Sequence, residues 1–216
     1  HSLALTVDGE VHAWGNNNSG QTDVPTALDG ETVTALSGGA HHSLALTDNG
    51  EVFAWGQDSG GQSTVPAALD GETVTDIAAG GDFSLALTAD GEVHAWGINF
   101  EGQTDVPEEL DGETITDISA GRRHAVALTE TGDVYAWGGN DHGELAIPGE
   151  LDDIEVTAVS AGAHHTLAMS GHPETPPDED DQPGGGSLPG GSLDAGSLGD
   201  SGSVAALGSL VLGGAG

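Results

Sequence analysis

The stretch Thr88–Gly97, with the sequence T-A-D-G-E-V-H-A-W-G, decides how this chain folds. Closely related blocks occupy Thr6–Gly15, Thr47–Gly56 and Thr129–Gly138, so the tryptophans recur at a constant step of 41 residues. No insertion or deletion interrupts this step. A fixed period in this range is typical of solenoids, propellers and other repeat arrays, so the repeat decides the fold class.

The composition divides the chain into a repeat region and a tail. Residues 1–169 carry four full repeats and the start of a fifth, with boundaries at 1–41, 42–82, 83–123, 124–164 and 165–169. The tail, 170–216, is a Pro- and acid-rich linker followed by Gly-Ser-Leu-rich sequence, without Phe, Trp or Tyr. It can bury too little apolar surface to offset its ordering entropy, so we predict disorder. We also expect the chain to come from a longer precursor with further repeats upstream.

The charge of the chain is extreme. The chain contains 36 acidic residues and only two basic ones, Arg122 and Arg123, which gives a formal net charge of −34. This charge repels nucleic-acid phosphates and anionic membranes, so we exclude nucleic acid as a partner. We attribute the acidity to solubility, in one version in a high-salt habitat. A calcium-binding role has no support, because no D-x-[DN]-x-[DN]-G calcium loop is present. The chain has no cysteine, and its apolar end, 204–216, is too short to cross a membrane.

Each repeat begins with two short strands. In the first repeat these are 3–6 and 11–14, joined through Asp8-Gly9, a dipeptide that favours a two-residue type I′ hairpin. That turn predicts a register in which Leu3 pairs with Trp14 and Leu5 with His12. One face would then be bulky and the other small, and neither would be strongly polar. Both faces therefore need covering, which stacked copies of the repeat provide.

The rest of the repeat is also β-rich. Asp23–Pro25 is a short extended piece, and Thr32–Leu36 is a strand that ends before Gly38-Gly39. This gives about four strands per repeat and no helical periodicity. The predicted fold is therefore all-β, a β-propeller of four-stranded blades with a disordered C-terminal tail.

Gly39–Leu46, Asn49–Gly56 and Gly61-Gln62 resemble the hallmark of the regulator-of-chromosome-condensation repeat family. That hallmark is Gly-x-x-His-[Ser/Thr]-Leu-Ala-Leu, followed by x-Asp-Gly-x-Val-x-x-Trp-Gly and Gly-Gln. The compact form, with Gly20–Pro25 and Gly102–Pro107, is similar to secreted bacterial members, above all the β-lactamase-inhibitor propellers. The resemblance implies a propeller, usually of seven blades, that grips a partner protein through its loops.

Two sets of repeat-equivalent histidines are interpreted as packing residues. His1, His42, His124 and His165 share a position with Phe83, whereas His12 and His94 share one with Phe53 and Tyr135. Equivalent positions on stacked sheets lie roughly 10 Å apart, too far for metal–nitrogen bonds of about 2 Å. We therefore expect no metal site. We also expect the four tryptophans to pack between blades rather than to form a ligand-stacking surface.

The variable positions of the repeat are the candidate binding site. The pairs Ala40-His41, Gly81-Asp82, Arg122-Arg123 and Ala163-His164 lie on a loop before the repeat histidine, where binding functions concentrate. A second variable loop contains Phe100 and His142. The predicted protein-binding residues are His41, Asp82, Arg122, Arg123, His164, Phe100 and His142. These loops are aromatic-rich in the inhibitor propellers and polar here, which argues against inhibition of a β-lactamase.

No catalytic motif is present: the chain lacks G-x-S-x-G, H-E-x-x-H, Walker and dinucleotide-binding patterns. We therefore predict a non-enzymatic protein-interaction module without a cofactor. We place it on a secreted or surface-displayed bacterial protein, where it binds an unidentified partner protein and in one version inhibits an enzyme. Two alternatives stay open: a repeat domain attached to an enzyme or carbohydrate-active region outside this sequence, and a structural spacer.

Overall fold

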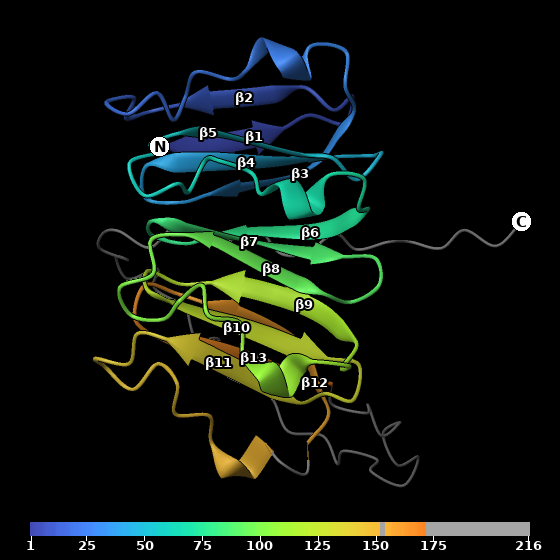
Figure 1. Ribbon diagram of the computed structural model, residues 1–216, viewed down its shortest axis with the longest axis vertical. Helices are drawn as coiled ribbons and strands as arrows, with labels where there is room; N and C mark the ends of the chain where they lie inside the picture. Colours follow the sequence, from blue (N-terminus) through green and yellow to red (C-terminus); the bar gives the residue numbers. More distant parts are fainter. Residues whose placement is uncertain (152–153, 172–216) are drawn as a thin grey trace, which may run out of the picture.

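The computed structural model of the chain describes residues 1–151 and 154–171 (Figure 1). The tail predicted to be disordered lies almost entirely outside these residues. Within them, small antiparallel sheets stack along the long axis of the molecule. The sheets are β1 (Ser2–Leu5) with β2 (Val11–Trp14); β3 (Val33–Gly38), β4 (His42–Thr47) and β5 (Val52–Gly56); β6 (Val74–Ala79), β7 (Phe83–Thr88) and β8 (Val93–Gly97); β9 (Ile115–Ala120), β10 (His124–Thr129) and β11 (Val134–Gly138); and β12 (Val156–Ala161) with β13 (Thr166–Ser170).

The hairpin register differs from the prediction by one residue. Ser2 pairs with Trp14 and Leu5 with Val11, because the turn contains three residues rather than two. Gly9 donates its N–H to Thr6 O and has φ of 80°, and Thr6 N–H bonds to Glu10 O. This is a type I turn followed by a glycine bulge, which uses Asp-Gly as readily as the type I′ turn does.

The shifted register changes which residues share a face. In the third sheet Leu85 and Leu87 lie opposite Ala95 and Val93 on one face. Trp96 lies opposite Ser84 on the other face, not beside the leucines as predicted. The leucine face of each sheet packs against the tryptophan face of the next, and the apolar clusters between sheets combine residues from both. The prediction that unlike faces stack is therefore confirmed, whereas the prediction of which residues share a face is wrong.

A β-bulge recurs in β3, β6, β9 and β12, which are the first strands of the second to fifth sheets and are called the inner strands. The pairing of β3 with β4 shifts between Val33 and Ala35, and the hydroxyl of the intervening Thr34 donates to Leu46 O at 3.2 Å. Thr75, Thr116 and Thr157 donate to the middle strand in the same way. The threonine hydroxyl satisfies a carbonyl that the bulge removes from the ladder. The inner strands of successive sheets contact one another, which brings the bulges to one edge of the stack.

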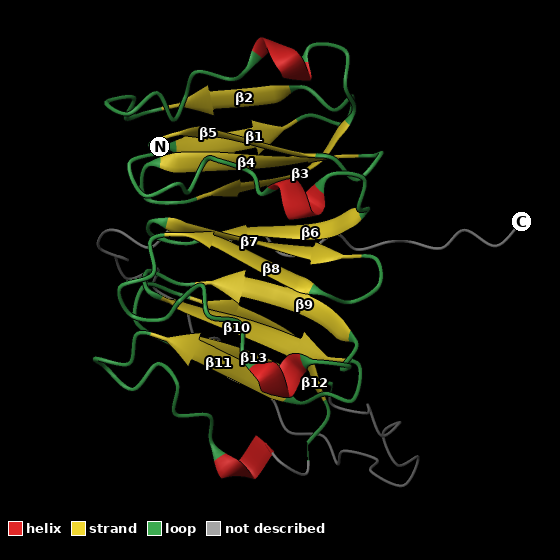
Figure 2. Cartoon of the chain, viewed as in Figure 1, coloured by secondary structure: helices red, strands yellow, loops and turns green. Residues whose placement is uncertain are grey.

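The expected fourth strand of each repeat is a loop with a 3-10 turn (Figure 2). In the first repeat, η1 (Thr26–Leu28) follows Pro25, which lacks the N–H that a ladder needs. Pro25 O accepts from Leu28 N–H at 3.0 Å, and Leu28 is buried between the sheets. The later turns are η2 (Ala67–Leu69), η3 (Glu108–Leu110) and η4 (Gly149–Leu151). Each complete sheet thus has three strands among the described residues.

The core lies between the sheets and weakens at both ends of the stack. Trp55, Trp96 and Trp137 are no more than 7% exposed, whereas Trp14 on the first sheet is 54% exposed. Leu167, on the last sheet, is 59% exposed, although the equivalent Leu85 is fully buried.

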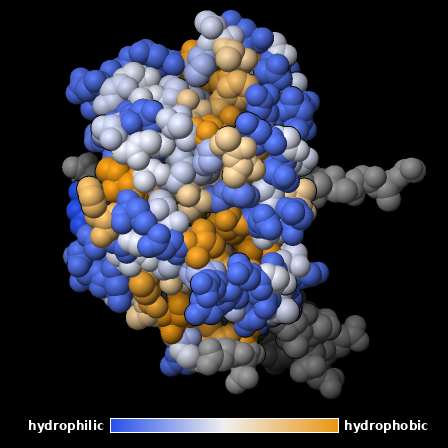
Figure 3. All heavy atoms as spheres, in the orientation of Figure 1, coloured by the Kyte–Doolittle hydropathy of each residue, from blue (hydrophilic) through white to orange (hydrophobic). Residues whose placement is uncertain are grey.

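The side of the molecule drawn in Figure 3 is largely hydrophilic, with apolar residues in separate patches. None of the helical turns in the described ranges has the length and hydropathy of a membrane span.

Candidate functional site

The turns that precede the middle strands form a continuous row at one end of the sheets, at the left in Figure 1. We call residues 40–41, 81–82, 122–123 and 163–164 the turn row. Ala40 N–H donates to Gly81 O at 3.2 Å, Gly81 N–H to Arg122 O at 3.2 Å, and Arg122 N–H to Ala163 O at 3.4 Å. Backbone hydrogen bonds thus link each turn to the next, so the variable residues of four repeats share one surface.

A second set of loops lies beside the turn row. We call 16–20, 57–61, 98–102 and 139–143 the outer loops. Gln57 N–H donates to His41 O at 2.9 Å, and Ile98 N–H donates to Asp82 O at 2.9 Å. Gly139 N–H does the same with Arg123 O at 2.7 Å. The two variable regions that the sequence analysis selected separately are therefore joined, repeat by repeat.

The buried histidines hold neighbouring sheets together beneath this surface. His42 Nε2 lies 2.9 Å from Ser84 Oγ, and the Ser84 hydroxyl donates to Gln62 O at 2.9 Å. A hydroxyl has one proton, so Ser84 must accept from His42, which places a proton on Nε2. Trp96 Nε1 donates to the same Gln62 O at 3.0 Å. These contacts support the structural role predicted for this histidine position.

Burial, the largest cause, lowers the pKa of His42 to about 4, and the nearby His41 acts in the same direction. The ring is therefore neutral at pH 7. Its Nδ1 atom has no hydrogen-bond partner among the described residues. A charged ring here would lose its hydration, and the charge of nearby Asp58 does not offset that loss, so His42 is a neutral packing residue with one hydrogen bond.

The other histidine position is only partly a packing position. His94 is half-buried, whereas the side chain of His12 is 61% exposed. Their Nε2 atoms lie 3.8 and 3.9 Å from Glu92 and Glu10. His12 lies on the same face of the first sheet as Trp14, and no described sheet covers that face, so His12 is exposed. The packing interpretation therefore applies to the inner sheets only.

A cleft of about 250 Å³ opens on this surface where the outer loop 98–102 meets the turns at 82 and 122–123. Four of the predicted residues line it, namely Asp82, Phe100, Arg122 and Arg123, together with Ile98, Glu101 and Gln103. Phe100 is 89% exposed. Arg123 Nη1 lies 3.4 Å from Glu101 Oε1 and 3.9 Å from Asp141 Oδ2. The cleft therefore combines an exposed aromatic ring with both of the chain's basic side chains.

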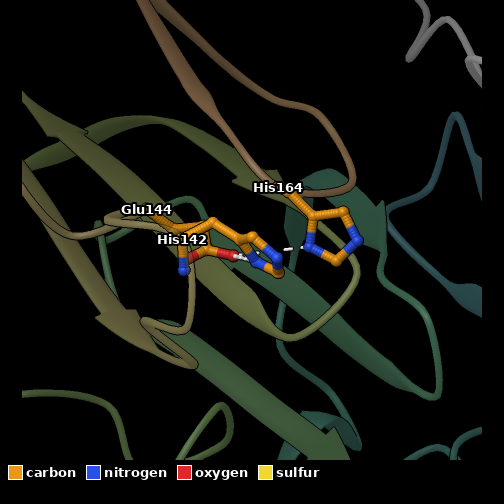
Figure 4. Close-up of side chains that lie close together, drawn as sticks. All are labelled: His142, Glu144 and His164. Atoms are coloured by element: carbon orange, nitrogen blue, oxygen red, sulfur yellow. Dashed lines mark hydrogen bonds and ion pairs between the residues drawn. The ribbon is translucent and has the colours of Figure 1, made fainter.

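The remaining predicted residues lie elsewhere on the same surface. His142 and His164 come together around Glu144 in the fourth repeat (Figure 4). His142 Nδ1 and His164 Nδ1 lie 3.3 and 3.4 Å from Glu144 Oε1, and the ring centroids are 4.5 Å apart. His41 is exposed and belongs to neither group. The turn row and outer loops thus carry two separate clusters.

The chain matches a family model for the regulator of chromosome condensation (RCC1) repeat. This model matches residues 1–21, 33–62, 74–103 and 115–144, about half of the chain. The chain belongs to the RCC1 repeat family. No curated protein matches the chain significantly in sequence.

Solved structures of two RCC1-like propellers and of a receptor kinase ectodomain share the fold. Human WBSCR16 is 23% identical, with a TM-score of 0.64 over 78% of this chain. Prp20p from Saccharomyces cerevisiae is 27% identical, with a TM-score of 0.62, and its structure was described together with its binding to Gsp1p and histones. The CR4 receptor kinase ectodomain from Physcomitrella patens is 24% identical, with a TM-score of 0.61. The chain covers 46–56% of these three chains.

Sequence reasoning missed Glu144 as a site residue. The other RCC1 repeats place Gln21, Gln62 and Gln103 at this position, so the replacement of an amide by a carboxylate was a visible signal. The expectation of no metal site considered repeat-equivalent histidines only. His142 and His164 are not equivalent: one is on an outer loop and the other in the turn row. The expectation did not consider the arrangement that the structure shows, in which two histidines and a carboxylate have ligand atoms within 4.8 Å of one another.

Proposed function

We propose that this RCC1 repeat protein is a non-enzymatic module that binds another protein through its turn row and outer loops. The observation that carries the proposal is the cleft containing Phe100, Arg122 and Arg123. Aromatic residues and arginine dominate the binding energy of protein interfaces, and an exposed phenylalanine otherwise lowers solubility. Both basic residues of a chain with net charge −34 belong to this one cleft.

The chemistry of the cleft indicates the partner's surface. Phe100 offers a ring for an apolar pocket, and Arg122 forms no ion pair with the described residues. A carboxylate on the partner can therefore pair with Arg122 without displacing an internal partner. The acidic surface around the cleft repels partners of the same sign, so it contributes to selection. An extracellular or cell-surface location, and an enzyme as the partner, are part of this proposal.

Affinity capture with matched variants tests the proposal. The bait is the full chain, and the cleft variant carries Phe100→Ala, Arg122→Ala and Arg123→Ala. The control variant carries Val7→Ala and Glu130→Ala, two exposed changes on the hairpin turns at the opposite end of the strands. We expect one protein to be retained by the wild type and the control but not by the cleft variant. Equal retention by all three baits would show that the partner does not use this surface.

A further inference from the structure

The fourth repeat differs from the other three at the position of a buried side chain. Gln21, Gln62 and Gln103 are each no more than 3% exposed, and the side-chain Oε1 of each accepts a backbone N–H from two residues earlier. All three hydrogen bonds are 2.9 Å long. Glutamine therefore has a structural role in each outer loop, which it performs with one side-chain oxygen.

Glu144 keeps that role and has one oxygen to spare. Its Oε2 accepts from His142 N–H at 2.8 Å, as the glutamine oxygen does in the other repeats. Where glutamine would present an NH₂ group, Glu144 presents Oε1. The Glu144 side chain is only 5% exposed, and Oε1 lies between the two imidazoles. The His142 N–H is the largest influence that lowers the pKa of Glu144, to about 2, so the carboxylate is ionised at neutral pH.

Two of the distances among the three groups are those expected between ligands of one small metal ion. The two Nδ1 atoms lie 3.3 and 3.4 Å from Glu144 Oε1, and all three ligand atoms lie within 4.8 Å of one another. Zinc bonds of about 2.0–2.2 Å in a tetrahedron place neighbouring ligand atoms about 3.3–3.6 Å apart. Two imidazole ligands favour zinc and its transition-metal neighbours over magnesium and calcium, which prefer oxygen.

We propose that His142, Glu144 and His164 bind a divalent transition-metal ion, with zinc as the member of the class that fits best. The ion would connect the outer loop after β11 to the turn between β12 and β13, and so would join the fourth sheet to the fifth. The side chains of His142 and His164 are 59% and 43% exposed, so the site opens to solvent. A fourth coordination position remains for water or for a ligand from a partner.

The chain provides a conservative variant and a matched control. Glu144→Gln restores the residue of the other three repeats and keeps an acceptor for His142 N–H, so it should fold. His164→Ala removes a second ligand. His41→Ala is the control, because His41 has the same repeat position as His164, whereas the repeat equivalent of Glu144 one period earlier, Gln103, and its counterparts Gln62 and Gln21 are not carboxylates. Each variant leaves the many surface carboxylates that bind cations weakly almost unchanged.

Calorimetric titration of the metal-free full chain with zinc tests the proposal, with excess magnesium present to occupy surface carboxylates. We expect one zinc ion per chain. Loss of an outer-shell partner lowers metal affinity about 10–100-fold, so Glu144→Gln and His164→Ala should each weaken binding at least about 100-fold. His41→Ala should bind like the wild type. Absence of wild-type binding, wild-type affinity in Glu144→Gln, or equal loss in His41→Ala would each overturn the proposal.

Hydrogen exchange separates a metal site from a simple histidine–glutamate ion pair. Zinc should slow amide exchange in β12 and β13 of the wild type, because the ion attaches this last sheet to the one before it. It should leave exchange unchanged in Glu144→Gln. If zinc binds but exchange in β12 and β13 does not respond, the ion does not join these two sheets and that part of the proposal is wrong.

Discussion

Two neighbouring interfaces of the stack have the same geometry but different chemistry. Between the second and third sheets His42 donates to Ser84, a polar pair inside the core. Between the third and fourth sheets the equivalent residues are Phe83 and Ala125, both fully buried and both without a side-chain polar atom. The two interfaces therefore differ at both members of the pair: phenylalanine replaces histidine and alanine replaces serine. A buried polar group costs more when left alone than when both partners are replaced, which explains why no mixed pair occurs here.

The outer pairs follow the same rule. His1 Nε2 lies 3.0 Å from Ser43 Oγ, and His124 Nε2 lies 3.2 Å from Thr166 Oγ1. His1, His42 and His124 thus each face a hydroxyl on the next sheet, and the one phenylalanine faces a methyl group. A glycine three residues before each of the rings at 42, 83 and 124 leaves room for it: a Cβ at Gly80 would overlap the Phe83 ring. The packing between neighbouring sheets therefore keeps the same shape at this position, and only the polarity of the paired side chains varies.

The largest effect is expected when the indole is removed from either interface. Trp137→Ala and Trp96→Ala should each lower the free energy of unfolding by about 3–5 kcal/mol, because both rings are buried. Trp137→Ala should cost about 1 kcal/mol more, because Gln62 O keeps its bond from Ser84 whereas Ala125 offers no hydroxyl to Gln103 O. Chemical denaturation measures the difference. Trp14→Ala, at an exposed site, is the control and should cost far less.

Acid should weaken the polar interface specifically. His42 has a pKa of about 4 in the folded protein and about 6.5 when unfolded, so the unfolded chain binds the extra proton first. The His42 contribution is therefore lost as the pH falls from about 6.5 through 4, by up to about 3 kcal/mol. The variant His42→Phe with Ser84→Ala copies the apolar interface and should lose less stability over this range. Parallel pH profiles for the two proteins would contradict the assignment.

The smallest effect is expected from mixing the two chemistries. Phe83→His alone should lower the free energy of unfolding by about 1–3 kcal/mol, because Ala125 offers the buried ring no acceptor. Adding Ala125→Ser should recover most of this loss, since the serine hydroxyl would stand where Ser84 does. A double-mutant cycle measures the coupling between the two changes. Additive effects would mean that the pair is not exchanged as a unit.

The repeat period, the strands and the packing role of the inner tryptophans could be read from the sequence because each is repeated. The register could not, because Asp8-Gly9 suits two different turns. The signal that separates them is Thr6, whose hydroxyl accepts from Glu10 N–H at 3.0 Å and favours the longer turn. The same threonine contact recurs in the later hairpins. Flanking side chains, rather than the dipeptide, decide the register.

The candidate site was predictable as a set of positions but not as an arrangement. The variable residues of the turn row and outer loops were selected because they change while the frame does not. Which of them meet depends on how neighbouring sheets stack. The stacking brings Phe100, on the loop after the third sheet, to Arg122 and Arg123, on a turn of the fourth sheet, and brings His142 of the fourth sheet to His164 of the fifth. Glu144 was not selected because glutamate has nearly the same size and shape as the glutamines at the equivalent positions, although its charge differs.

Because a leucine face always meets a tryptophan face, the interface between sheets is heterologous and has a direction. A duplicated repeat inserted in the stack would again offer a leucine face and a tryptophan face to its neighbours, so only the polarity of the histidine or phenylalanine pair would have to be matched anew. The number of repeats can therefore change by unequal recombination while the loops diverge independently. In this architecture the length of the array and the specificity of its surface are separate heritable properties.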